Sequence, residues 1–157
     1  MTSTSTGADD AHARVTALGL QLIETHASLL EALDHLREGT LPPADLATHC
    51  AAFCAAVTTH HTGEDATVFP ALAAAHPSLR EVLAGLQHDH EAIAAILQRA
   101  ASLAGALDAP GTRGELDGLA AILESHFAWE ERRLVAALNA LTPAAPPALT
   151  RAVAFPT

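Results

Sequence analysis

Leucine spacing along four stretches of this chain restricts it to a small set of folds. In each stretch apolar side chains recur three, four or seven residues apart, the repeat of a helix with one buried face. No stretch alternates apolar and polar residues as a half-buried strand would. Four such helices with short connections predict an all-α protein, an antiparallel up-down-up-down four-helix bundle. The apolar positions of the first stretch are Leu18, Leu22, Leu29, Leu33 and Leu36.

Proline and capping residues predict where these helices begin and end. Ser78 with Glu81, and Thr112 with Glu115, have the spacing of capping boxes that would open the third and fourth helices. Pro70 predicts a kink or an early end of the second helix, because proline lacks a backbone N–H. The expected bounds are, in chain order, 10–38, 42 to about 69, 78 to about 107, and 112–141.

The length of 157 residues fits one domain, which the helices place at residues 10–141. Residues 1–9 are expected to be disordered, and residues 142–157 to form a Pro-rich, extended tail in which Phe155 is a candidate for packing on the bundle. The opening residues lack the basic and apolar segments of a signal peptide. No apolar run is long enough to span a membrane, so we expect a cytoplasmic protein.

The charge balance excludes some classes of partner. The formal net charge is −10, with 18 acidic residues against eight Arg and no Lys. Nucleic-acid binding requires clustered cations, and acidic surfaces are repelled by anionic membranes, so neither is an expected partner. The chain also contains ten His, scattered rather than in a tag. Histidine ligates metals, which makes this excess the first indication of function. We expect a monomer or a homodimer.

An internal repeat reduces the ten histidines to four. His60-His-Thr-Gly-Glu64 in the second helix matches His126-Phe-Ala-Trp-Glu130 in the fourth, and an acidic residue follows each Glu. The preceding helix of each pair supplies one further His. The chain therefore reads as two copies of a helical hairpin. The candidate site residues that the repeat brings into register are His26, His60, Glu64, His90, His126 and Glu130.

This spacing places each His–Glu pair on one helical face, one turn apart. Each pair shares its face with apolar residues and should point into the core. A carboxylate there is costly unless it is paired or binds metal. Four imidazoles and two carboxylates suit two first-row transition metals. If each metal were held by two His and by two bridging Glu, with an oxo or hydroxo bridge between the metals, each metal would keep about one open position.

Simpler explanations remain open for single residues. A lone buried His can be satisfied by a backbone carbonyl, and a His–Glu pair can be an ordinary surface pair. Arg133, one turn beyond Glu130, could neutralise that carboxylate without metal. His88 could replace His90 if its helix were rotated. His61 should point about 100° away from His60, which favours a supporting or interface role.

The same residues carry a family resemblance. His26, His60-xxx-Glu64 followed by Val-Phe-Pro, His90, and His126-xxx-Glu130 resemble the hemerythrin-like, HHE cation-binding family over about residues 10–141. The resemblance implies a four-helix bundle, a di-iron centre and chemistry with dioxygen, nitric oxide or peroxide. Oxygen-carrying hemerythrins have a His-xxx-His pair in the third helix, which this chain lacks. It is more similar to bacterial di-iron relatives with four His and two Glu.

The leading functional hypothesis is a non-haem di-iron protein that reacts with peroxide, dioxygen or nitric oxide, including peroxide dismutation in a detoxifying role. The alternatives are a dioxygen or nitric oxide sensor or carrier, an iron-handling protein, and a structural zinc bundle. The two open iron positions expected from a four-histidine set favour reaction over reversible carriage.

Overall fold

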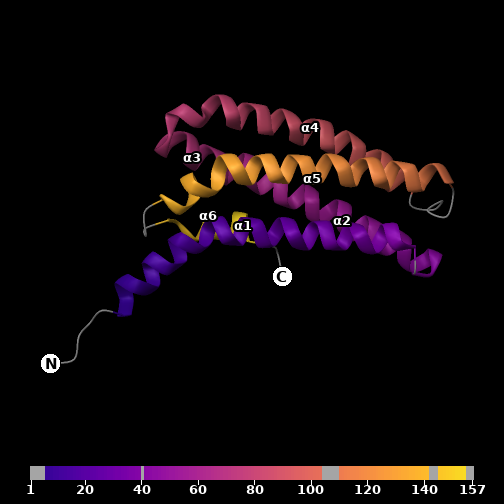
Figure 1. Cartoon of the computed structure of the whole chain (residues 1–157), viewed down its shortest axis with the longest axis horizontal. Coiled ribbons are helices and arrows are strands. Elements are labelled where there is room, and N and C mark those ends of the chain that lie inside the picture. Colours follow the sequence, from indigo (N-terminus) through magenta and orange to yellow (C-terminus); the bar gives the residue numbers. More distant parts are fainter. Residues whose placement is uncertain (1–5, 40, 104–109, 142–144, 155–157) are drawn as a thin grey trace.

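The computed structural model describes residues 6–39, 41–103, 110–141 and 145–154. These residues are helical and contain no strand, which confirms the all-α prediction. Four long helical segments lie side by side as a helical bundle (Figure 1). They are α1 (Thr6–Glu38), α2 (Pro43–Gly63) with its continuation, α4 (Arg80–Ser102) and α5 (Pro110–Asn139). Contacts run from α1 to α2, α2 to α4, α4 to α5 and α5 back to α1.

The first helix agrees with its expected end but not with its expected start. Gly39 adopts a φ of 67°, in the left-handed region that glycine reaches without strain, and α1 ends beside it. The helix begins at Thr6 rather than at Asp10, so residues 6–9, which we expected to be disordered, are helical. Residues 1–5 lie outside the described part of the chain.

We expected Pro70 to kink the second helix or to end it near Phe69, and the structure has an irregular helical turn there instead of an end. A five-residue π-helix, η1 (Glu64–Val68), precedes it, and the chain continues as α3 (Phe69–Ala75). The N–H of Phe69 bonds to the carbonyl of Glu64, five residues back. The physical reason is that Pro70 cannot donate to the carbonyl of Ala66, and a wider turn accommodates the missing bond. The extra residue brings Val68 and Phe69 into the core.

Neither expected capping box forms a helix start. A short 3₁₀ turn, η2 (Pro77–Leu79), precedes α4, whose N-cap is Leu79 and lacks a side-chain capping bond. Helix α5 begins at Pro110, two residues before Thr112, because proline suits a first helical position. The capping spacing therefore marked both regions but not the residue at which each helix begins.

The C-terminal tail contains a short helix, which corrects our expectation of an extended segment. Helix α6 (Pro147–Val153) begins at a proline and buries Leu149 and Val153 against the bundle. It contacts α1, α2 and η1. The hydroxyl of Thr25 in α1 donates a hydrogen bond of 3.0 Å to the carbonyl of Val153. The packing expected for Phe155 lies outside the described residues.

Two apolar clusters fill the bundle and leave a polar layer between them. One is centred on Leu33, Val57 and Leu123, and the other on Leu22, Phe69 and Leu134. Along each helix the histidines and glutamates predicted as a site fall between the two clusters. None of the described helices carries an apolar stretch that could cross a membrane.

Candidate metal centre

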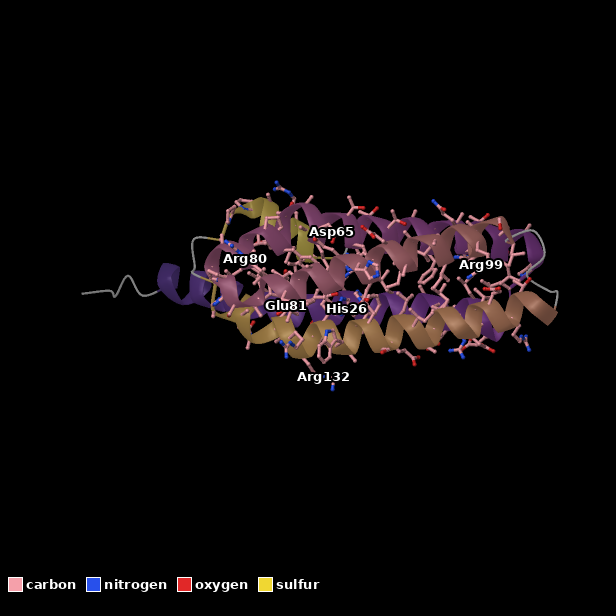
Figure 2. All side chains as sticks on the ribbon, turned by 90° about the horizontal axis from the view of Figure 1, so that it is seen from above. His26, Asp65, Arg80, Glu81, Arg99 and Arg132 are labelled. Carbon is pink, nitrogen blue, oxygen red and sulfur yellow. The ribbon has the colours of Figure 1, made fainter. Side chains whose placement is uncertain are left out.

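The polar layer brings together all six residues singled out by the repeat, and adds a seventh. Each is almost completely buried, at 5% exposure or less. His26, labelled in Figure 2, lies near the middle of the long axis of the bundle, between the ribbons. The seven residues are His26 from α1, His60 and His61 from α2, Glu64 from η1, His90 from α4, and His126 and Glu130 from α5.

The two glutamates form the centre of this layer. Oε1 of Glu64 lies 2.9 Å from Nε2 of His60 and 3.9 Å from Nε2 of His90. Oε1 of Glu130 lies 3.9 Å from Nε2 of His26, and its Oε2 lies 3.2 Å from Nε2 of His126. Despite these approaches, none of the four carboxylate oxygens has a hydrogen bond of acceptable geometry within the part of the chain that the structure describes. Four unpartnered oxygens in a dry core require a cation or a proton.

Burial perturbs the ionisation of both carboxyls. It raises the pKa of Glu64 to about 7, with the neighbouring charge of Asp65 adding to the shift. It raises the pKa of Glu130 well above its usual range, and the proximity of Glu64 adds to that shift. A metal cation would reverse both effects, because a positive charge favours the ionised carboxylate.

The imidazoles are held in the form that binds metal. Burial, assisted by the neighbouring histidines, lowers the pKa of His26 to about 2 and that of His90 to about 3. Burial also lowers the pKa of His60 and, together with nearby His90, that of His61. These side chains are therefore neutral at physiological pH, and a neutral imidazole offers a lone pair to a metal.

Acidic side chains at the edge of the layer orient three of the rings. Nδ1 of His26 lies 2.9 Å from Glu131, and Nδ1 of His90 lies 2.7 Å from Asp65. Both contacts link the two hairpins. Glu131 of the second hairpin contacts His26 of the first, and Asp65 of the first contacts His90 of the second. Asp89 approaches Nδ1 of His126 at 3.4 Å.

Because a carboxylate only accepts hydrogen bonds, each of these Nδ1 atoms carries the proton. The lone pair is then on Nε2 and points inward. The repeat showed that an acid follows each Glu, but it gave no indication that each acid braces the opposite hairpin.

An approximate internal two-fold relation connects the two halves of the layer. His26 and His60 have ring centroids 5.0 Å apart, and so do their counterparts His90 and His126. The distances from His26 to Glu130 and from His90 to Glu64 are both 3.9 Å. The hairpin repeat seen in the sequence is thus a geometric repeat at the site.

The relation fails at His60. Asp89 approaches His126, but the matching position before His26 is Thr25, which bonds to Val153 instead. Nδ1 of His60 consequently has no partner among the described residues.

A comparison with protein families decides the classification. The hemerythrin HHE cation binding domain matches residues 8–138, which is most of the chain. This chain belongs to the hemerythrin HHE family. Comparison with curated proteins and with solved structures gives no significant match.

The donors of this HHE domain fall into two groups. Donor atoms of His26, His60, Glu64 and Glu130 all lie within 4.8 Å of one another, and so do those of His61, His90 and His126. The inward Nε2 atoms of His61, His90 and His126 are buried without a hydrogen-bond partner. Nitrogen and carboxylate donors of this kind suit first-row metals, and their unpaired atoms fit a bound cation. The hemerythrin domain thus has buried clusters able to hold metal.

His61 also enters the layer. We expected it about 100° round the helix from His60, in a supporting or interface role, and its ring stacks on His90 at a centroid distance of 3.9 Å and lies 5.2 Å from His126. The physical reason is that α2 contacts both α1 and α4. Its buried arc therefore spans two adjacent positions, and the HHE layer contains five imidazoles rather than four.

The other open possibilities are settled against a role in the layer. His88 is exposed and lies near Glu91, so it does not replace His90. The guanidinium of Arg133 lies over the ring of Trp129, 5.2 Å from its centroid, rather than neutralising Glu130.

Two cavities reach the layer from outside. One, of about 470 Å³ between α4 and α5, is lined by His126, Asp89 and Trp129. The other, of about 180 Å³ between α2 and α4, is lined by His61 and His90. Both reach the three-histidine group of the HHE domain.

Proposed function

We propose that this hemerythrin HHE domain, built on an antiparallel four-helix bundle, is a non-haem di-iron protein that binds and reacts with dioxygen, nitric oxide or peroxide. The observation that carries the proposal is the pair of buried glutamates whose four oxygens have no hydrogen-bond partner among the described residues. They lie between two groups of buried imidazoles, and burial lowers the pKa of His26, His60, His61 and His90 in these groups. Cations in this layer would neutralise the carboxylates and accept the lone pairs of the imidazoles.

The donor groups assign ligands to each metal in this proposal. His26 and His60 would hold one ion, and His61, His90 and His126 the other, with Glu64 and Glu130 shared between the two. Imidazole and carboxylate donors without thiolate suit several first-row metals, and the resemblance to di-iron hemerythrins favours iron among them. An oxo or hydroxo bridge would complete the pair. The bound irons would supply redox chemistry and sites for a small ligand.

The fifth imidazole changes the expected number of open positions. Counting two carboxylates and a bridge on each side, three histidines would give one ion six ligands and two histidines would give the other ion five. One open position per chain would then replace the two that a four-histidine set would leave. The chain contributes apolar surroundings along the bundle axis, since apolar clusters lie on either side of the layer. These surroundings favour small neutral ligands over hydrated ions.

A sensor or carrier of dioxygen or nitric oxide is the second candidate. A layer with His61 as a fifth imidazole supports a sensor or carrier more strongly than the four-histidine set predicted from the sequence. The reason is that a single open position limits the ways in which two ligand atoms can react together. Such a protein would form a stable adduct with a changed visible spectrum and no turnover.

Measurement of bound metal and of the visible spectrum tests the proposal. We expect two irons per chain and an absorption band typical of an oxo-bridged pair. Oxygen evolution from peroxide, compared with free iron, then separates the two candidates, since a carrier would not exceed free iron. Iron that is lost within minutes to a mild chelator would indicate an iron-handling protein. Colourless protein with bound zinc would refute the di-iron proposal.

A further inference from the structure

Two thiols of helix α2 lie outside the layer of histidines and glutamates. Cys50 and Cys54 are both free and buried, at 0% and 9% exposure. Residues four apart share a helical face, and both sulfurs point toward α4. Sγ of Cys50 lies 4.0 Å from the carbonyl oxygen of Ala100, and Sγ of Cys54 lies 3.8 Å from that of Leu97. The chain thus carries a pair of nucleophilic side chains that the candidate metal centre does not use.

The contact between the two thiols makes one of them acidic. Hydrogen bonding with Cys54 lowers the pKa of Cys50 to about 7. Hydrogen bonding with Cys50, together with burial, raises the pKa of Cys54. The pair therefore releases one proton near neutral pH and keeps the other. A thiolate beside a neutral thiol is the arrangement that peroxide converts to a disulfide, because one sulfur is oxidised first and the other then attacks it.

A cavity connects this pair with the metal layer. The cavity of about 180 Å³ between α2 and α4 is lined by His61 and His90 of the layer and also by Thr58 and Leu97. The hydroxyl of Thr58 donates a hydrogen bond of 2.8 Å to the carbonyl of Cys54, and the carbonyl of Leu97 approaches the Cys54 sulfur. A small molecule in this cavity therefore contacts residues that touch Cys54, which is the more exposed of the two thiols.

The helix permits a bond between the two sulfurs. Four residues along an α-helix separate the Cα atoms of Cys50 and Cys54 by about 6 Å, inside the span of about 4.4 to 6.8 Å that a disulfide bridges. Both Cβ atoms lie on the same face and tilt in the same direction along the helix. We propose that Cys50 and Cys54 form a second reactive site, a dithiol that reduces peroxide entering the α2–α4 cavity and closes to a disulfide without metal.

The reaction balances with peroxide as the oxidant. The thiolate of the pair attacks one peroxide oxygen, the O–O bond breaks, and the departing hydroxide takes up the proton that the pair had released. The second sulfur attacks the sulfenic acid so formed, the S–O bond breaks, and water leaves with the remaining proton as the disulfide forms. Two thiols lose two electrons, and one peroxide becomes two waters. Dioxygen is not a product, which separates this reaction from peroxide dismutation at the metal centre.

Counting of free thiols in the full chain tests the proposal, both as purified and after metal is removed with a chelator. The protein is treated with a small excess of hydrogen peroxide, unfolded, alkylated and analysed by mass spectrometry. Both forms should lose their two alkylatable thiols and remain single chains, and a dithiol reductant should restore them. The metal-free form should evolve no dioxygen. Cys50→Ser and Cys54→Ser should each gain oxygen on the remaining sulfur instead of forming an internal bond.

Two variants of α4 test the route of the peroxide. Ala94 lines the cavity, whereas Ala95 is exposed on the same helix and lies outside it. Ala94→Phe should slow the loss of thiols severalfold, and Ala95→Phe, the matched control, should be oxidised at the wild-type rate. The proposal is overturned if both thiols of the metal-free chain stay alkylatable, if the disulfide joins separate chains, or if Ala94→Phe is oxidised as fast as Ala95→Phe.

Discussion

Replacing Glu64 by glutamine should change stability in opposite directions with and without metal. In the metal-free chain burial raises the pKa of this carboxyl from 4.5 to about 7. A group whose folded-state pKa is raised stabilises the protein below its unfolded pKa, and that contribution is lost as the pH rises through the folded value. Ionised Glu64 therefore destabilises the folded, metal-free chain at pH 8. Glutamine cannot ionise and removes this destabilisation.

The magnitude follows from the two pKa values. At pH 8 the difference in ionisation between the folded and unfolded states corresponds to about 3 kcal/mol, and at pH 5 to about 1 kcal/mol. The metal-free Glu64→Gln variant should therefore exceed wild type in free energy of unfolding by up to about 3 kcal/mol at pH 8, and by much less at pH 5. With iron present the order should reverse, because a bound metal stabilises only the chain that retains its ligands.

Urea unfolding followed by far-ultraviolet circular dichroism provides the assay, at both pH values, in chelator and in excess ferrous iron without oxygen. Glu124→Gln is the matched control, since Glu124 lies on the exposed face of α5 and should change neither series. The reasoning is refuted if Glu64→Gln destabilises the metal-free chain at pH 8 or leaves the iron-induced gain in stability unchanged.

Three further outcomes follow from the site geometry. Asp65→Asn or Glu131→Gln should weaken iron binding about tenfold to a hundredfold in a chelator competition, because each acid orients an imidazole. His61→Ala should reduce bound iron, whereas His88→Ala, on the exposed surface, should not. Metal-free protein should be less stable at pH 5 than at pH 7, seen by urea unfolding. Four imidazoles with lowered pKa resist protonation when folded, and the carboxyls with raised pKa, Glu64, Asp65, Glu130 and Glu131, offset part of that loss.

The periodicity of leucine predicted the helices, because residues three, four and seven apart lie on the same face of a helix, and that face is buried. Leucine spacing did not predict the local structure at Pro70. A kink, a break and a π-helix can each accommodate a residue that has no N–H to donate. The choice depends on whether Val68 and Phe69 can reach the core, which is a property of the packed bundle. Helix α6 was missed for a related reason. A Pro-rich tail is extended by itself, and Leu149 and Val153 make it helical only by packing on the bundle.

The site was largely predictable because its residues are duplicated. A single buried histidine has several explanations, but a repeated His-xxx-Glu in the same register has few. His61 was overlooked because the helix was treated as having one narrow buried face. The repeat did contain a signal. Phe127 occupies the equivalent position in the second motif, and a phenylalanine beside a buried histidine indicates that this position faces inward.

The two halves of the layer differ in their covering as well as in their ligands. Helix α6 covers the first half and packs beside Gly63, where an added Cβ would be in ordinary van der Waals contact with Ala152, at 3.5 to 3.7 Å. The equivalent residue in the second motif is Trp129, which is 44% exposed and lines the cavity that reaches His126. The side that we propose to be open for a ligand thus lies under α6, and the fully ligated side borders the cavities. A ligand at the open position would be shielded from water by α6, which favours retention of a bound diatomic molecule over rapid exchange.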